Sequence, residues 1–197
     1  EMCIRDRKWA WDLGRPDSTA PAEADETYTL STPNSWAPIS ADDELGLVYI
    51  TTGNAAGDFY GGTRTEQEDT FSSSLVALDA LTGKVKWHFQ TVHHDLWDYD
   101  LSPQPALIDF PTANGTRPAV IQATKSGQLF VLDRATGEPL VDISEAAVPQ
   151  GTAPGDYTAA TQPFSPGMPS TMGRPSKNPE VLLSLIHISE PTRLRRI

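Results

Sequence analysis

The sequence has a single cysteine among its 197 residues, Cys3, so no disulfide framework can constrain the fold. It also lacks any apolar run near the roughly 18 residues that a membrane-spanning helix needs. Positive charge is scarce, since 15 Lys and Arg residues stand against 26 Asp and Glu residues, for a net charge of −11. Proteins that bind nucleic acid present a basic face, so this balance argues against that class.

Proline and glycine are plentiful by contrast, with 17 and 14 residues, and long stretches of helical periodicity are few. This combination favours short strands joined by turns over a helical bundle. With 38% hydrophobic residues, the chain has enough apolar material to bury a core. The sequence therefore predicts an all-β fold.

A short unit occurs at residues 75–87 and again at residues 129–141, an offset of 54 residues. Each copy has an apolar strand, then Asp-x-x-Thr-Gly, then a second predicted strand. The glycine suits a left-handed turn position, and the Asp carboxylate can accept hydrogen bonds from the backbone amides of that turn. Each copy is therefore predicted to be a hairpin closed by its own Asp side chain.

Residues 8–12 match residues 86–90, with Trp9 in the place of Trp87, and indicate the end of an earlier, incomplete copy. A repeat of about 40 to 50 residues fits a four-stranded propeller blade. The Trp that closes each unit is expected to lie flat between adjacent blades. Val141 stands at that position in the last copy, so less aromatic surface is expected there. We expect about two to three blades, against the four to eight or so of a closed ring.

Both ends of the chain differ from the rest. Residues 184–197 switch to a basic segment without strand alternation or turn residues, and they resemble translated sequencing-adapter read-through. Residues 1–7 have the same character. We expect both segments to be artefacts that flank a partial propeller at residues 8–183; the alternative for the last segment is a genuine basic tail that docks on a partner.

The stretch from His93 to Asp100 concentrates imidazoles, carboxylates and aromatic rings directly behind the second repeat. A zinc site on His93, His94 and Asp95 is one reading, but adjacent residues on a strand face opposite ways and a further ligand is not identified. Structural histidines that brace the loop are the other reading.

Two motifs together carry a resemblance to a known family: Ala77-Leu78-Asp79-x-x-Thr82-Gly83-Lys84-x-x-Trp87, and the stretch 90–98. Together they resemble the pyrroloquinoline quinone (PQQ)-dependent dehydrogenases, and within them the membrane-bound glucose, quinate and shikimate group. Shorter matches extend this resemblance over residues 8–181, at 31–38, 49–54, 72–79, 122–127, 149–151, 155–157 and 161–164.

The resemblance implies an eight-bladed β-propeller with PQQ in its central channel. It implies oxidation of a sugar or polyol of glucose, quinate or shikimate type by hydride transfer to the quinone, with ubiquinone as electron acceptor. The location implied is the periplasmic face of the bacterial inner membrane, with the membrane anchor outside this chain. Because other blades would complete the pocket, we expect the fragment to be inactive by itself.

Six residues match functional or supporting positions of that family. Asp98 matches the general base that removes the hydroxyl proton, and His94 and Trp97 are expected to hold its loop in place. Trp36 matches the indole that lies against the flat cofactor. Lys125 matches a cation that points at the quinone oxygens. Asn54 matches a ligand of Ca²⁺, or of Mg²⁺ in its place.

Two other functions remain open. A soluble PQQ-dependent alcohol dehydrogenase would be favoured by Arg at position 125, where this sequence has Lys. A propeller with the same Trp-docking repeats could also be a non-catalytic scaffold of the outer-membrane assembly type. A scaffold has no reason to gather Trp36, Asn54, Asp98 and Lys125 in one place, so their positions discriminate between the classes.

Overall fold

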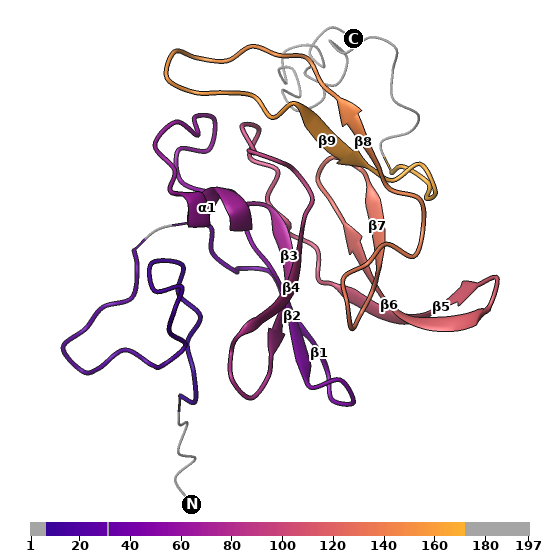
Figure 1. Ribbon diagram of the computed structural model, residues 1–197, viewed down its shortest axis with the longest axis horizontal. Helices are drawn as coiled ribbons and strands as arrows, with labels where there is room; N and C mark the ends of the chain where they lie inside the picture. Colours follow the sequence, from indigo (N-terminus) through magenta and orange to yellow (C-terminus); the bar gives the residue numbers. More distant parts are fainter. Residues whose placement is uncertain (1–6, 31, 172–197) are drawn as a thin grey trace, which may run out of the picture.

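The computed structural model describes residues 7–30 and 32–171, and these form three antiparallel sheets and one short helix (Figure 1). The first sheet has the order β1-β2-β3-β4, the second β5-β6-β7 and the third β8-β9. The elements are β1 Ser40–Asp42, β2 Leu47–Thr51, α1 Glu66–Phe71, β3 Ser74–Asp79, β4 Val85–Gln90, β5 Ala106–Thr112, β6 Gly115–Ala123, β7 Leu129–Asp133, β8 Ser144–Ala147 and β9 Thr161–Phe164. In the described residues, no helix has the length and apolar character to cross a membrane.

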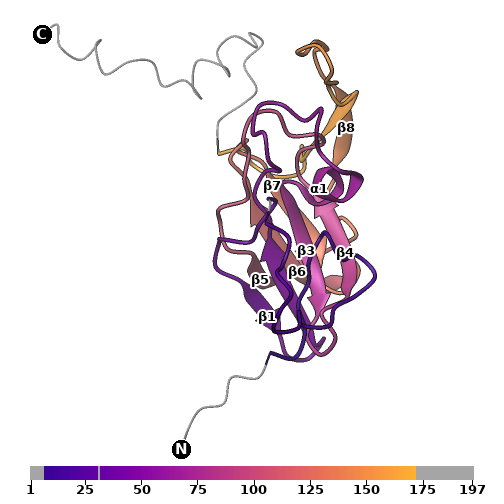
Figure 2. The same ribbon diagram turned by 90° about the vertical axis from the view of Figure 1, so that its left-hand side faces the viewer.

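The strand β3 is buried on both faces, which explains its unbroken apolar run. Leu75 and Ala77 belong to a core that includes Val120 and Leu132 of the second sheet. Val76 and its neighbours on the opposite face pack against the tryptophans of the N-terminal segment. Successive side chains of a strand point to opposite faces, so one strand can serve both cores. The first sheet thus lies between the N-terminal segment and the second sheet (Figures 1 and 2).

The Asp-x-x-Thr-Gly turn folds in the same way in both copies. Asp79 Oδ1 accepts hydrogen bonds from the backbone N–H groups of Leu81 and Thr82 at 3.1 and 2.9 Å. Asp133 Oδ1 does the same in the second copy, 54 residues later, at 2.9 and 3.2 Å. The glycines of the two turns have φ values of +71° and +76°, which only glycine adopts without strain. The predicted side-chain closure of the turn is confirmed.

Each repeat also receives the tryptophan of the unit before it. Trp9 Nε1 donates to the carbonyl of Ala80 at 2.8 Å, and Trp87 Nε1 donates to that of Arg134 at 3.1 Å. A Cβ at Gly137 would lie only 2.7 Å from Trp87 Cδ2, and one at the equivalent Gly83 would lie 2.4 Å from Trp9 Cε3. The ring of Trp87 therefore lies flat on the next sheet's turn, as the repeat predicted, and Trp9 does belong to an earlier copy.

The prediction of a second strand in every copy is wrong for the last one. There the expected strand at residues 139–141 is reduced to a single bridge between Leu132 and Pro139, followed by a hydrogen bond from Leu140 N to the carbonyl of Val131 at 2.9 Å. Proline has no N–H to donate to a ladder, so Pro139 interrupts the pairing that the matching residues sustain in β4. The described residues thus form one four-stranded blade, a three-stranded blade and a further hairpin.

Helix α1 was not predicted, although its start is marked in the sequence. The side chain of Thr65 accepts a hydrogen bond from Glu68 N, and the Glu68 carboxylate accepts one from Thr65 N. This reciprocal capping box satisfies two backbone donors that a helix start would otherwise leave unpaired. Of the two terminal segments predicted to be artefacts, only Arg7 lies within the described residues, where it donates to the Tyr28 hydroxyl at 2.7 Å.

Candidate functional site

Three segments converge on the backbone of Gly53, two residues after the end of β2. A Cβ atom at this position would lie 2.7 Å from Asp100 Oδ1 and 3.2 Å from Trp36 Nε1. Only a glycine leaves room for both side chains to approach the chain this closely. The end of β2, the segment before β1 and the loop after β4 therefore meet at one point of the surface.

Lys125 joins this group from the turn that precedes β7. Its Nζ donates to the backbone carbonyl of Asp98 at 2.8 Å, and it lies 3.2 Å from Asp100 Oδ2 and 3.6 Å from Asp98 Oδ2. The lysine side chain is 36% exposed and that of Asp98 is 41% exposed. The structure thus brings the predicted base and the predicted cation together at an accessible place.

The environment of Asp98 favours its protonated form more than water would. Partial burial and the neighbouring carboxylates of Asp100 and Asp58 raise its pKa, and the Lys125 ammonium offsets part of that shift. A carboxylate with a raised pKa is a stronger proton acceptor when it is ionised. Asp98 also has a φ of +58°, in the left-handed region, so the chain turns sharply at this residue.

The buried residue Asp95 holds the loop in that shape. It accepts hydrogen bonds from the Ser73 hydroxyl at 2.5 Å and from the backbone N–H groups of Trp97 and Tyr99 at 2.9 and 2.8 Å. Burial raises the pKa of Asp95, although these three donors oppose the shift. The sequence suggested Asp95 only as a metal ligand, and the signal for its present role was the Asp-x-Trp spacing of a side-chain-capped turn.

His94 lies on the opposite side of the loop, where its buried imidazole contacts three other side chains. Its Nδ1 is 2.8 Å from Asp69 Oδ1 of α1, and its Nε2 is 2.8 Å from Asp156 Oδ1. The Tyr157 ring stacks on the imidazole with 3.6 Å between centroids, and the Tyr157 hydroxyl donates to Asp69 Oδ2 at 2.8 Å. We call Asp69, His94, Asp156 and Tyr157 the histidine clasp. It ties the loop after β4 both to α1 and to the long β8–β9 connection.

The hydrogen bonds within the histidine clasp favour a structural role for His94 over a role as a zinc ligand. Burial by itself would raise the pKa of Asp156, but hydrogen bonds from His94, Gly61 N and Tyr157 N together lower it. Burial and the hydrogen bond to Asp69 raise the pKa of Tyr157 to about 12. The described residues contain no group of three or more His, Cys, Asp or Glu side chains arranged to hold a metal.

Trp36 is 55% exposed beside Gly53, which is unusual for so large an apolar side chain. An accessible indole beside Gly53 and an ammonium group paired with Asp100 fit a flat aromatic ligand that carries negative charge. PQQ, a planar quinone with carboxylate groups, has this chemistry. Trp36 and Lys125 are therefore the residues that could contact it, and Trp97 lies deeper in the loop, with its ring centroid 6.2 Å from that of Tyr99.

Asn54 reaches the same corner but faces inward. Its Oδ1 accepts from the Ser72 hydroxyl at 2.9 Å, its Nδ2 donates to the carbonyl of Asp58 at 2.8 Å, and its backbone N–H donates to Asp100 Oδ1 at 2.5 Å. The residue is buried. In the described part of the chain the donor set around Asn54 does not fit a closed Ca²⁺ or Mg²⁺ site, which requires six or more oxygen ligands or their waters.

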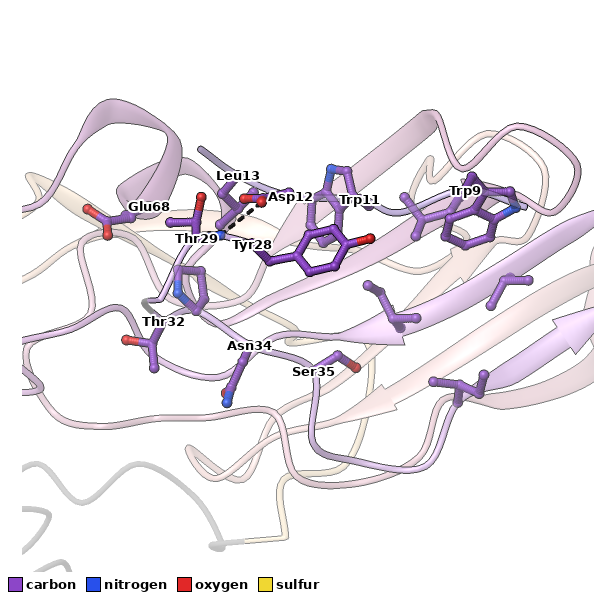
Figure 3. Close-up of a pocket in the computed structure, with 15 residues that line it drawn as sticks. Trp9, Trp11, Asp12, Leu13, Tyr28, Thr29, Thr32, Asn34, Ser35 and Glu68 are labelled. Atoms are coloured by element: carbon purple, nitrogen blue, oxygen red, sulfur yellow. Dashed lines mark hydrogen bonds between the residues drawn. The ribbon is translucent and has the colours of Figure 1, made fainter. Parts of the chain in front are cut away.

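A separate cavity of about 380 Å³ lies on the other face of the first sheet, under the N-terminal segment (Figure 3). Trp9, Trp11 and Tyr28 line it together with Ile50 and Leu78. The hydrogen bond from Thr29 N to Asp12 Oδ2, at 2.9 Å, fixes the segment that covers it. None of the six predicted site residues lines this cavity.

Near Gly53 the structure gathers Trp36, Asn54, Asp98 and Lys125. The enzyme interpretation predicts this clustering, and the scaffold interpretation does not. Comparison with known proteins points the same way. The family model for the β-propeller domain of PQQ-type glucose, ethanol and alcohol dehydrogenases matches residues 6–188.

Three curated proteins illustrate the similarity. The glycerol dehydrogenase large subunit of Gluconobacter oxydans is 48% identical over 164 residues, which are 82% of this chain and 22% of that protein. The quinoprotein glucose dehydrogenase of Escherichia coli is 50% identical over 158 residues, 80% of this chain and 20% of that protein. The quinate/shikimate dehydrogenase (quinone) of Acinetobacter baylyi is 45% identical over 163 residues, which are 82% of this chain and 20% of that protein.

The chain thus spans about a fifth of the length of these relatives. The match nevertheless covers most of the chain and includes both repeats, the loop after β4 and the Lys125 turn. The chain belongs to the PQQ-type glucose, ethanol and alcohol dehydrogenase family, as part of its β-propeller domain.

Proposed function

We propose that this chain forms one wall of the active site of a PQQ-dependent dehydrogenase that oxidises a sugar or polyol of glucose, quinate or shikimate type. The observation that supports this most directly is the placement of Lys125 within 3.6 Å of Asp98, beside an exposed Trp36. The names of the three relatives refer to glycerol, glucose and quinate or shikimate, all of which carry several hydroxyl groups.

In the proposed reaction, the ionised Asp98 carboxylate takes the proton of the substrate hydroxyl. When bound, PQQ would supply the quinone that accepts a hydride from the carbon bearing that hydroxyl. Trp36 and Lys125 would hold the cofactor: the indole would lie against its ring system, and the ammonium would stabilise negative charge on its oxygens. The product is the corresponding carbonyl compound, and the abstracted proton resides on Asp98 until solvent removes it.

The metal ion is a separate part of the proposal. Asn54 is the predicted ligand of Ca²⁺ or Mg²⁺, and it lies within the same corner of the molecule. Because its amide oxygen already accepts from Ser72, a bound ion would need ligands from other parts of the full-length enzyme. No step of the proposed reaction is therefore assigned to the metal.

The resemblance also supports a cellular setting. We propose that the full-length enzyme, meaning the longer protein that would contain this chain, works at the periplasmic face of the inner membrane and passes electrons to ubiquinone. By the same argument, this chain by itself neither retains PQQ firmly nor turns over substrate. The alternative of a soluble alcohol dehydrogenase is less favoured because position 125 is Lys.

The test is Asp98→Asn in the full-length enzyme loaded with PQQ. Loss of the base should lower kcat by about 10²- to 10⁴-fold while the cofactor is retained, because the amide has the same shape but cannot take the proton. Dye-linked assays with glucose, quinate and glycerol would measure turnover, and the visible absorbance of PQQ would measure occupancy. Asp109→Asn, a change to an exposed carboxylate of β5, is the control. Unchanged turnover in Asp98→Asn would refute the base role.

A further inference from the structure

The Asp100 carboxylate contacts two parts of the candidate site, the backbone of Asn54 and the ammonium of Lys125. Its Oδ1 accepts the backbone N–H of Asn54 at 2.5 Å, and its Oδ2 lies 3.2 Å from Lys125 Nζ. The side chain is 21% exposed, half as much as that of Asp98. Asp100 therefore links the end of β2 to the turn that carries the cation.

The carboxylate of Asp100 is held firmly from both sides. Gly53 packs against its Oδ1, and the next residue, Leu101, is fully buried in the core between the two sheets. The backbone carbonyl of Asp100 also accepts from Ser102 N at 3.2 Å. A side chain anchored in this way can fix the position of a more mobile partner.

Lys125 is such a partner. A lysine side chain loses about 1.5–2 kcal/mol of rotamer entropy when it is held in one conformation. Within the described part of the chain, its ammonium contacts three oxygens: the Asp98 carbonyl at 2.8 Å, Asp100 Oδ2 at 3.2 Å and Asp98 Oδ2 at 3.6 Å. The nearer of its two carboxylate partners is thus Asp100, not the base.

This order of distances matters because the two carboxylates of Asp98 and Asp100 compete for an ion pair with one ammonium group. If Lys125 paired tightly with Asp98, the base would be neutralised by its own neighbour and turned away from a substrate hydroxyl. With Asp100 Oδ2 as its nearer anionic partner at 3.2 Å, the ammonium stays 3.6 Å from Asp98 Oδ2 and does not form its closest ion pair with the base.

We propose that Asp100 is a positioning residue that holds the Lys125 ammonium beside Asp98 and so keeps the Asp98 carboxylate free to accept a proton. The inference rests on the proposed function, since it assumes that Asp98 is the base and that Lys125 faces the cofactor. It assigns Asp100 no contact with substrate or PQQ.

A double-mutant cycle in the full-length enzyme tests this role. Asp100→Asn retains an oxygen that can accept from Asn54 N but replaces the oxygen near Lys125 with an amide NH₂ group. We expect kcat to fall by about tenfold to a hundredfold, as for a small displacement of a catalytic group, while KM changes by less than about threefold. Asp100→Glu, which restores a carboxylate, should recover part of the loss.

The second arm of the cycle removes the partner. In a Lys125→Met background, Asp100→Asn should have almost no further effect on kcat, because the residue acts through the lysine. The dissociation constant of PQQ, measured on the apoenzyme by quenching of tryptophan fluorescence, should rise several-fold with Asp100→Asn in the Lys125 background and stay unchanged in the Met background. Asp109→Asn, which removes another aspartate paired with a cation, is the matched control.

Additive effects of Asp100→Asn and Lys125→Met on both kcat and PQQ binding would overturn the inference. If Asp100→Asn fails to fold, as judged by its melting temperature, the same cycle with Asp100→Glu decides, since a longer carboxylate displaces the ammonium without removing the charge. The parallel Asp98→Asn variant separates the two hypotheses. If Asp98→Asn is inactive and the Asp100 cycle is additive, only the Asp100 role is lost; if Asp98→Asn is fully active, the proposed function fails.

Discussion

The two halves of the loop after β4 both carry aspartates but place them in opposite environments. In residues 93–95, the side chains of His94 and Asp95 are buried and each has its polar atoms paired. In residues 98–100, Asp98 and Asp100 lie at the surface and share one cation. Only two residues, Leu96 and Trp97, thus separate a structural anchor from a group of charges that is open to a ligand.

The comparison of Asp95 with Asp98 shows why a raised pKa alone does not identify a catalytic residue. Burial is the largest cause of the shift in both carboxyls. Asp95, however, has 0% exposure and three hydrogen-bond donors, so no substrate can reach it. Asp98 is 41% exposed and has two carboxylates nearby. Access, together with the perturbed pKa, distinguishes the candidate base.

The largest expected difference between the two halves concerns stability. His94→Ala leaves the carboxylates of Asp69 and Asp156 without their imidazole partner, and the side chain of Asp156 is 0% exposed. Because a hydrogen bond to a charged group contributes about 1.5–3 kcal/mol, the loss of both should cost about 3 kcal/mol or more. Asp98→Ala removes only a surface group and should cost less than about 1 kcal/mol. Thermal denaturation of the full-length enzyme would compare the two melting temperatures. Equal losses would contradict the division of the loop into an anchor and a reactive half.

A smaller loss of stability is expected from a change at Asp95, which connects the two halves of the loop. Asp95→Ala leaves the backbone N–H groups of Trp97 and Tyr99 without an acceptor, which costs about 1–3 kcal/mol. Because the same hydrogen bonds shape the loop at Asp98, kcat should fall as well. Ser73→Ala removes only one donor to Asp95 and should have a milder effect on both quantities. A variant at Asp95 with reduced stability but normal kcat would show that the loop halves are independent.

The smallest expected effect is on the pH dependence of turnover. The base works in its ionised form, so kcat/KM should fall as the pH drops through the pKa of Asp98, which lies above the ordinary aspartate value of 3.8. Asp58→Asn removes one of the negative charges that raise this pKa, so the acid limb should move to lower pH by less than about one unit. A pH–rate profile of both enzymes measures the shift. Movement to higher pH would show that another group limits the rate.

Much of the fold could be predicted because it is encoded locally and twice. The Asp-x-x-Thr-Gly turn needs only its own residues, and two copies at a fixed offset identify a repeated blade. Docking of Trp9 and Trp87 on the next unit followed from the same alignment. Pro139 shows where the alignment misled, since a single residue without an N–H interrupts a strand that the repeat otherwise predicts.

The site was predictable only in part. The resemblance selected Trp36, Asn54, Asp98 and Lys125, and these gather at Gly53 as it implied. The roles of Asp95 and Asp100 were not visible, because both are aspartates in a stretch crowded with polar residues. Their functions depend on the donors that face them, and these include Asn54 N in the segment after β2, the Ser73 hydroxyl and the Lys125 ammonium.

The sequence by itself therefore determined the all-β repeat, the closed turns, the tryptophan docking and the set of candidate residues for the proposed site. Only the tertiary structure decided how the carboxylates divide their tasks. Burial and hydrogen-bond partners control the charge and access of a carboxylate, and both depend on segments far apart in the chain. Asp95, Asp98 and Asp100 are chemically identical, and the fold makes them an anchor, a candidate base and a clamp on Lys125.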